Sequence, residues 1–115
     1  MRWQRYNAIV TFLYSVEGGR QEPPQPPFSI NNPYAPDLVI SGDTRNLSVR
    51  FVGGPSISSG GWGRFTFIEN DLECDYSTLS VGVEFAIRED GAVVGYGEVV
   101  EKVWSRSAYN QTPLT

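Results

Sequence analysis

The sequence lacks histidine altogether and contains a single cysteine, Cys74, in 115 residues. Without histidine, the chain cannot build a histidine-dependent catalytic triad, most zinc sites or the usual general base. One cysteine cannot form a disulfide within the chain, and a lone buried or half-buried thiol is typical of a reducing compartment. We therefore predict that the protein is not an enzyme and has no metal site and no cofactor.

Long apolar runs and an excess of positive charge are also missing. The longest apolar stretch near the N-terminus, Ala8–Tyr14, is interrupted by Thr11 and is too short to span a membrane. Arg2 and Arg5 precede it, but no signal-peptide cleavage pattern follows, so we expect a cytoplasmic protein without a membrane partner. The net charge of −4 argues against a protein that coats nucleic acid.

Two strands around a tight turn form the clearest local pattern. Alternating apolar and polar residues predict a strand over Leu79–Arg88, and β-branched residues predict a second over Ala92–Trp104. Between them, Asp90-Gly91 suits the positive φ angles of a type I′ turn. Gly95 and Gly97 face the same side of the second strand, which indicates a sharp bend of the sheet, as a small closed barrel needs, or the close approach of another chain.

The rest of the chain contains several short strand patterns and no helical periodicity. The predicted strands are Asn7–Val16, Leu38–Ile40, Leu47–Val52 and Arg64–Ile68. One face of the first strand is apolar, and the other is not very polar either, so we expect a loop or a partner to cover part of it. Many short strands separated by turn signals predict a single all-β domain over residues 1–115, a barrel or a sandwich.

A proline-rich loop at residues 21–36 contains two overlapping PxxP spacings. Such spacings occur in ligands of SH3-type domains, but they also arise by chance in any proline cluster. We favour a rigid connector over the barrel, anchored by Phe28, Ile30 and Tyr34. The unusual length of the loop favours a binding role to some extent.

Three other segments allow two interpretations or carry little information. Trp62 follows a Gly/Ser-rich stretch; we expect it to close one end of a barrel, and the alternative is an exposed recognition residue. Acidic residues at positions 69, 71, 73 and 75 predict a solvated loop, because the glycine and distal glutamate of an EF-hand calcium site are absent. Residues 105–115 are polar and predict a flexible tail.

Two stretches resemble one known family. The hairpin from Gly82 to Val100, GVEFAIREDGAVVGYGEVV, resembles the last hairpin of the C-terminal domain, domain three, of elongation factor Tu, typically GLRFAIREGGRTVGAGVV. Residues Tyr6–Leu13, followed by Glu17–Arg20, are similar to the first strand of that domain, FEAEVYVLSKDEGGRHTPF. The resemblance implies a closed six-stranded Greek-key β-barrel that stands alone.

The resemblance also implies a function. In that family the domain does no chemistry, packs against the GTPase domain and the second barrel, and contacts the T-stem of aminoacyl-tRNA. This chain has no GxxxxGK[ST] phosphate loop and cannot itself be the GTPase. By matching text, the positions near tRNA would be Gly19, Arg20, Glu89, Asp90 and Gly91. Asp90 replaces a glycine of the family and adds a negative charge where a phosphate backbone would pass.

We therefore expect a non-catalytic module that binds a protein partner, with a homodimer left open. The candidate partner-binding residues are Arg20, Pro24, Phe28, Tyr34, Trp62, Arg88, Glu89 and Asp90. The alternative is a module that binds structured RNA such as tRNA through Arg20 and the turn at residues 88–91. An enzyme is the least favoured class, because no pair of carboxylates has a diagnostic spacing.

Overall fold

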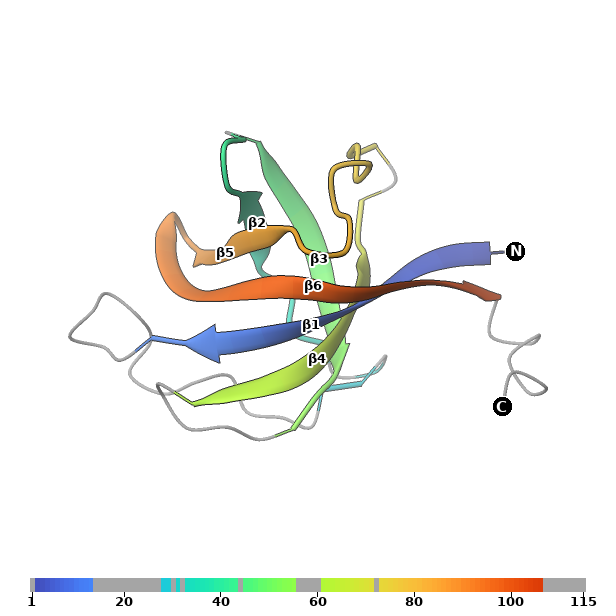
Figure 1. The fold of residues 1–115 in the computed structure, drawn as a ribbon, viewed down its shortest axis with the longest axis horizontal. Helices are drawn as coiled ribbons and strands as arrows, with labels where there is room; N and C mark the ends of the chain where they lie inside the picture. Colours follow the sequence, from blue (N-terminus) through green and yellow to red (C-terminus); the bar gives the residue numbers. More distant parts are fainter. Residues whose placement is uncertain are drawn as a thin grey trace.

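The computed structural model describes residues 2–13, 28–29, 31, 33–43, 45–55, 61–71 and 73–106. Within these residues the chain forms six strands and no helix (Figure 1). The strands are β1 (Arg2–Phe12), β2 (Asp37–Ile40), β3 (Asn46–Gly53), β4 (Trp62–Glu69), β5 (Glu84–Glu89) and β6 (Ala92–Arg106). The predicted all-β fold is confirmed.

The strands pair antiparallel in the order β1-β4-β3-β2-β5-β6, and the pairing of β6 with β1 closes the barrel. Consecutive strands β2, β3 and β4 are neighbours, whereas β5 lies on the other side of β2. This is the strand arrangement of a Greek key. The closed six-stranded barrel is therefore present, and closure pairs the edges that an open sheet would expose.

The type I′ turn between β5 and β6 is also confirmed. Asp90 has a φ of 50° and Gly91 a φ of 84°. Positive φ at both central positions gives the turn the twist of the flanking strands, which explains why Asp-Gly stands here. The register runs without a break from the Glu84–Glu98 pair to the Ile87–Gly95 pair, and then shifts by a bulge next to the turn.

The ends of the terminal strands differ from the prediction. β1 begins at Arg2, before the predicted start at Asn7, so that start is wrong. The strand ends at Phe12 with Leu13 outside it, and residues 14–16 of the predicted span lie outside the described part of the chain. Residues 2–6 become strand because β6 runs on to Arg106 and pairs with them, and Figure 1 shows the two strands continuing side by side. Positions 105 and 106 therefore belong to β6 rather than to the predicted tail, whose residues 107–115 lie outside the described part of the chain.

The start of β5 differs as well. The prediction placed the strand from Leu79, but β5 starts at Glu84. Gly82 has a φ of 91° in a turn before the strand, and Leu79 is fully buried against the core. Leu79 thus belongs to the core from outside the strand and does not extend the hairpin.

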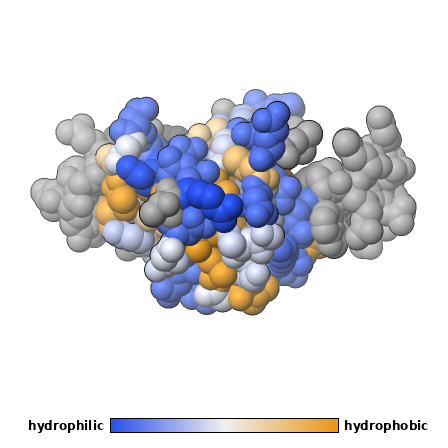
Figure 2. Space-filling view, turned by 90° about the horizontal axis from the view of Figure 1, so that it is seen from above, coloured by the Kyte–Doolittle hydropathy of each residue, from blue (hydrophilic) through white to orange (hydrophobic). Residues whose placement is uncertain are grey.

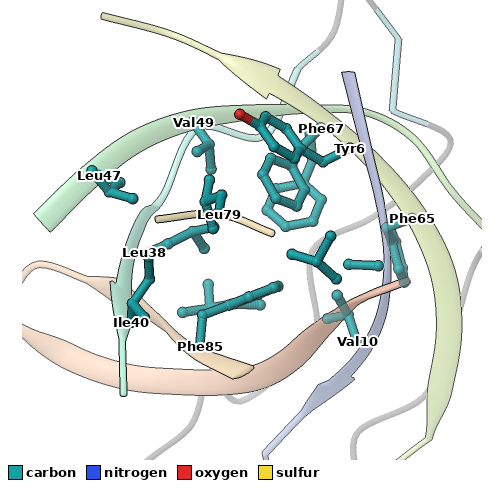
Figure 3. Close-up of a cluster of buried hydrophobic side chains, with 14 of the residues drawn as sticks. Tyr6, Val10, Leu38, Ile40, Leu47, Val49, Phe65, Phe67, Leu79 and Phe85 are labelled. Atoms are coloured by element: carbon teal, nitrogen blue, oxygen red, sulfur yellow. The ribbon is translucent and has the colours of Figure 1, made fainter. Parts of the chain in front are cut away.

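The core consists of side chains that point inward from all six strands, every second residue along β1 to β5, and Figure 3 labels members from those five strands. Phe67 lies among three other rings, with centroids 5.0 Å from Tyr6, 5.2 Å from Phe51 and 5.9 Å from Phe85. The other fully buried large side chains are Phe12, Phe65, Leu38, Leu79, Ile87, Val10, Val49 and Val99. Aromatic packing of this kind supplies much of the apolar area that a small barrel can bury.

The two glycines of β6 allow β6 to pack closely against its neighbours. A Cβ on Gly95 would lie 2.6 Å from the carbonyl oxygen of Thr11, and one on Gly97 would lie 2.5 Å from the ring of Phe85. Gly95 and Gly97 pair with the inward residues Ile87 and Phe85 and therefore face the core. At both positions the close neighbours belong to other strands of the same chain, so the glycines make room for the packing within the barrel.

Candidate functional site

The predicted contact residues do not form one surface. Phe28 is buried in the core, with its ring 5.5 Å from that of Tyr34, so it anchors the connector instead of facing a partner. Tyr34 is the second confirmed anchor, because it exchanges two backbone hydrogen bonds with Phe51. Arg20 and Pro24 lie outside the described residues, as does the third predicted anchor, Ile30.

Four of the predicted residues meet at the tip of the hairpin. Tyr34, Arg88, Glu89 and Asp90 line a hollow of about 370 Å³ together with residues 35–37. The hydroxyl of Tyr34 donates a hydrogen bond to the Glu89 carboxylate, and the guanidinium of Arg88 donates one of 2.7 Å to the Gly91 carbonyl. These bonds attach the segment before β2 to the hairpin and hold the turn.

We expect Tyr34→Phe to lower the free energy of unfolding by about 1–2 kcal/mol, because the substitution removes a hydrogen bond to a charged group in a half-buried place. Urea unfolding followed by circular dichroism measures the change. Tyr96→Phe is the matched control, since the Tyr96 side chain is exposed. Equal stability of both variants would contradict a structural role for the Tyr34 hydroxyl.

Trp62 does not close an end of the barrel, and this prediction is wrong. It is the first residue of β4, and 68% of it is exposed. Successive side chains of a strand point to opposite faces. Gly63 and Phe65 are buried and face inward, so Trp62 faces outward. A buried ring lies instead beyond the other end of β4: Tyr76, whose hydroxyl donates a hydrogen bond to the Ser48 carbonyl and accepts one from each of two backbone N–H groups.

A row of outward-facing residues crosses five strands at the level of Trp62. In register order it consists of Val39 (β2), Ala86 (β5), Tyr96 (β6), Thr11 (β1) and Trp62 (β4). We call this the outer row. Tyr96 is 53% exposed, so the row presents two large rings to solvent. The sequence contained a signal for Tyr96, because a residue between two inward-facing glycines must face outward.

A groove of about 670 Å³ runs along most of the outer row. Ile9 and four members of the row, Val39, Ala86, Tyr96 and Thr11, line it, and Glu84 and Glu98 lie beside them. The turn at residues 41–43 forms another side and is held by a hydrogen bond from the Asp43 N–H to the Ile40 carbonyl. We call this hollow the wall groove. In the view from above, Figure 2 shows separate apolar patches between hydrophilic side chains.

The charges next to the wall groove differ in how they are neutralised. Asp43 forms an ion pair of 2.8 Å with Arg45. Glu101, the register partner of Asn7, accepts hydrogen bonds from Arg64 and from Asn7. Glu84 and Glu98 are exposed and form no ion pair with any of the residues that the structure describes.

A third hollow, of about 280 Å³, lies at the other end of the barrel between Tyr6, Glu69, Tyr76 and Lys102. The hydroxyl of Tyr6 donates a 2.8 Å hydrogen bond to Glu69. Burial, together with this bond and the charge of Glu69, raises the pKa of Tyr6 above its ordinary range, so the phenol remains a donor. The hydrogen bond between Tyr6 and Glu69 is therefore a structural contact between β1 and β4.

The acidic segment after β4 forms turns. Asp71 accepts a backbone hydrogen bond from Glu73, and Asp75 accepts one from Ser77. The bond from Ser77 and the charge of Arg45 lower the pKa of Asp75. Among the described residues, no group of acidic, cysteine or histidine side chains is placed to hold a metal ion.

Comparison of the sequence with protein-family models and with curated proteins finds no match. The described part of the chain contains no helix that is long and apolar enough to cross a membrane. Function must therefore be inferred from the chemistry of the surface. Of the three hollows, the wall groove combines the largest volume with an exposed aromatic ring.

Proposed function

We propose that the barrel is a non-catalytic module that binds a protein partner through the wall groove and the adjoining end of the outer row. The observation that supports this most strongly is the exposure of Tyr96 and Trp62 on one face, with only Thr11 between them in the register. Tyrosine and tryptophan are the side chains that most often dominate protein interfaces. Two such rings beside a groove are more than scattered exposed apolar residues.

The chemistry of the wall groove supports binding more than catalysis. Its titratable side chains are Asp43, Glu84, Glu98 and Tyr96, all exposed or half-buried. Catalytic groups usually stand in enclosed sites where burial and neighbouring charges change their pKa values. The wall groove instead consists of the outer faces of strands and one turn, which suits a contact surface.

The resemblance of the hairpin to domain three of elongation factor Tu supports the same proposal, because that domain packs against other domains and does no chemistry. Binding of structured RNA, the alternative that the resemblance raises, is less compatible with the charges at the hairpin tip. There Asp37, Glu89 and Asp90 line the same hollow as the Arg88 guanidinium, which is already bound to a carbonyl. Such a surface repels a phosphate backbone. We further expect the protein to act in the cytoplasm.

We expect Tyr96→Ser and Trp62→Ser each to weaken partner binding about tenfold or more, while changing the free energy of unfolding by less than about 0.5 kcal/mol. Both side chains are exposed, so their removal leaves the core intact. The measurement is quantitative capture of crosslinked proteins from native lysate, compared between variant and wild type. Val81→Ser is the matched control, because Val81 is 62% exposed but does not line the wall groove.

Two outcomes would contradict the proposal. Capture that is equal for Tyr96→Ser, Trp62→Ser and wild type would remove the wall groove as the contact surface. A salt-dependent gel shift with tRNA that Arg88→Gln abolishes and Tyr96→Ser leaves unchanged would favour RNA binding at the hairpin tip instead.

A further inference from the structure

We propose that the wall groove selects a basic apolar peptide segment, in which a lysine or arginine side chain lies between Glu84 and Glu98 and an apolar side chain lies on the floor beside Tyr96. This inference rests on the proposed function and specifies the chemistry of the partner. It depends on an arrangement of charge that the fold itself does not neutralise.

Glu84 and Glu98 stand directly opposite each other on β5 and β6. Both are exposed and face outward, since the inward residues at this level are Phe85 and Gly97. Side chains in such a pair have Cβ atoms about 5 Å apart, and like charges at that distance destabilise the sheet. The barrel therefore contains a repulsion at the edge of the wall groove.

The cations near this pair already have other partners. Ile9 pairs with Glu98 on one side and with Arg64 on the other, so Arg64 lies at the same level as Glu98. Its guanidinium, however, bonds to Glu101 at 2.9 Å. Arg45 bonds to Asp43 at 2.8 Å, and its second contact, of 3.8 Å, is with Asp75. A cation from outside would thus find two unneutralised carboxylates, and a guanidinium can bind carboxylates through two parallel hydrogen bonds.

Apolar surface lies next to the two carboxylates. Ile9 is the register partner of Glu98, and Ala86 and Tyr96 form the next outward pair along β5 and β6. The half-exposed ring of Tyr96 can also receive a cation on its face. A wholly basic segment would leave this floor uncovered, and a wholly apolar one would bury the two charges without compensation.

The spacing along β6 predicts the pattern of the segment. Glu98 and Tyr96 are two residues apart on one face, which corresponds to about 6.8 Å in a strand. An extended peptide that lies along β6 repeats its side chains on one face at the same interval. We therefore expect a basic residue and a large apolar residue separated by one position.

Selection from a displayed library of random heptapeptides tests this inference. The wild-type chain is expected to enrich peptides with lysine or arginine two positions from an aromatic or aliphatic residue, at least about fivefold over the unselected library. The double variant Glu84→Gln/Glu98→Gln should keep the apolar preference and lose the basic one. Glu101→Gln is the matched control. This carboxylate already has partners, so its substitution should leave the preference for basic peptides unchanged.

The possible failures are distinguishable. Enrichment of apolar peptides without basic residues, lost in Tyr96→Ser, would overturn this inference and leave the proposed function standing. Equal enrichment by wild type and Tyr96→Ser would overturn both. Enrichment of acidic peptides, or an unchanged basic preference in the double variant, would also contradict the role of Glu84 and Glu98.

The thermal stability of Glu84→Gln provides a second readout. A misfolded variant would have a lower Tm, whereas the inference predicts a higher one. Because Glu84→Gln removes a like-charge repulsion, we expect it to raise Tm by roughly 1–4 °C while weakening the selected wild-type peptide about fivefold. The affinity of wild type for that peptide should fall as sodium chloride rises from 50 to 500 mM in the assay, and that of the double variant should fall less. A lower Tm for Glu84→Gln would contradict the repulsion.

Discussion

Gly95→Ala is expected to lower the free energy of unfolding by about 3 kcal/mol, a large part of the roughly 5–15 kcal/mol available to a domain. An alanine Cβ would lie 2.6 Å from the Thr11 carbonyl oxygen and 3.1 Å from the ring of Phe12. The first obstacle is backbone in the strand pair that closes the barrel, so it cannot rotate away as a side chain could. Relief requires β6 to move away from β1 where the two strands pair.

Equilibrium unfolding in urea, followed by circular dichroism, measures this loss, with an unchanged m-value if both states keep their compactness. Gly53→Ala is the matched control, since the nearest atom to its added Cβ would be the Thr66 side chain at 3.6 Å, an ordinary contact. A Gly95→Ala variant as stable as Gly53→Ala would show that β6 does not pass this close to β1.

Phe67→Ala is expected to cost about 3–5 kcal/mol, the range for truncating a buried aromatic side chain. Phe67 is fully buried, and its ring stacks on Tyr6 and contacts Phe51 and Phe85. Its removal leaves a void at the centre of the aromatic cluster, where rings from β1, β3 and β5 meet. Those strands are held in the barrel by their pairing, so they cannot collapse fully into the space.

The same urea titration measures the effect, and Phe67→Leu provides the comparison. Leucine fills most of the volume, so we expect a loss of about 1–2 kcal/mol for that variant. A loss below about 1 kcal/mol for Phe67→Ala would mean that the barrel interior is not packed as the ring contacts indicate.

Local signals made the hairpin predictable from the sequence. The turn at Asp90-Gly91 depends only on the positive φ angles that these two residues can adopt, and it forms as expected. Gly95 and Gly97 were informative because a glycine inside a strand usually marks a steric demand, and that demand exists at both positions. The predicted strands Leu47–Val52 and Arg64–Ile68 likewise lie within β3 and β4.

Features that depend on distant pairing were not predictable. The start of β1 is set by the length of β6, more than 90 residues away, and not by local hydrophobicity. Trp62 was expected to close an end of the barrel because large rings usually do so, but its strand parity turns it outward. The outer row and the Glu84–Glu98 pair exist only through the register of several strands, which no single segment specifies.

The central claim is that the barrel meets a protein partner at the wall groove. Photo-crosslinking tests it most directly, with a benzoylphenylalanine side chain placed at position 96 in one sample and at position 90, on the hairpin tip, in another. We predict one discrete crosslinked protein from position 96 and none from position 90. Crosslinking from position 90 alone, or an equal absence of products from both positions, would contradict the claim.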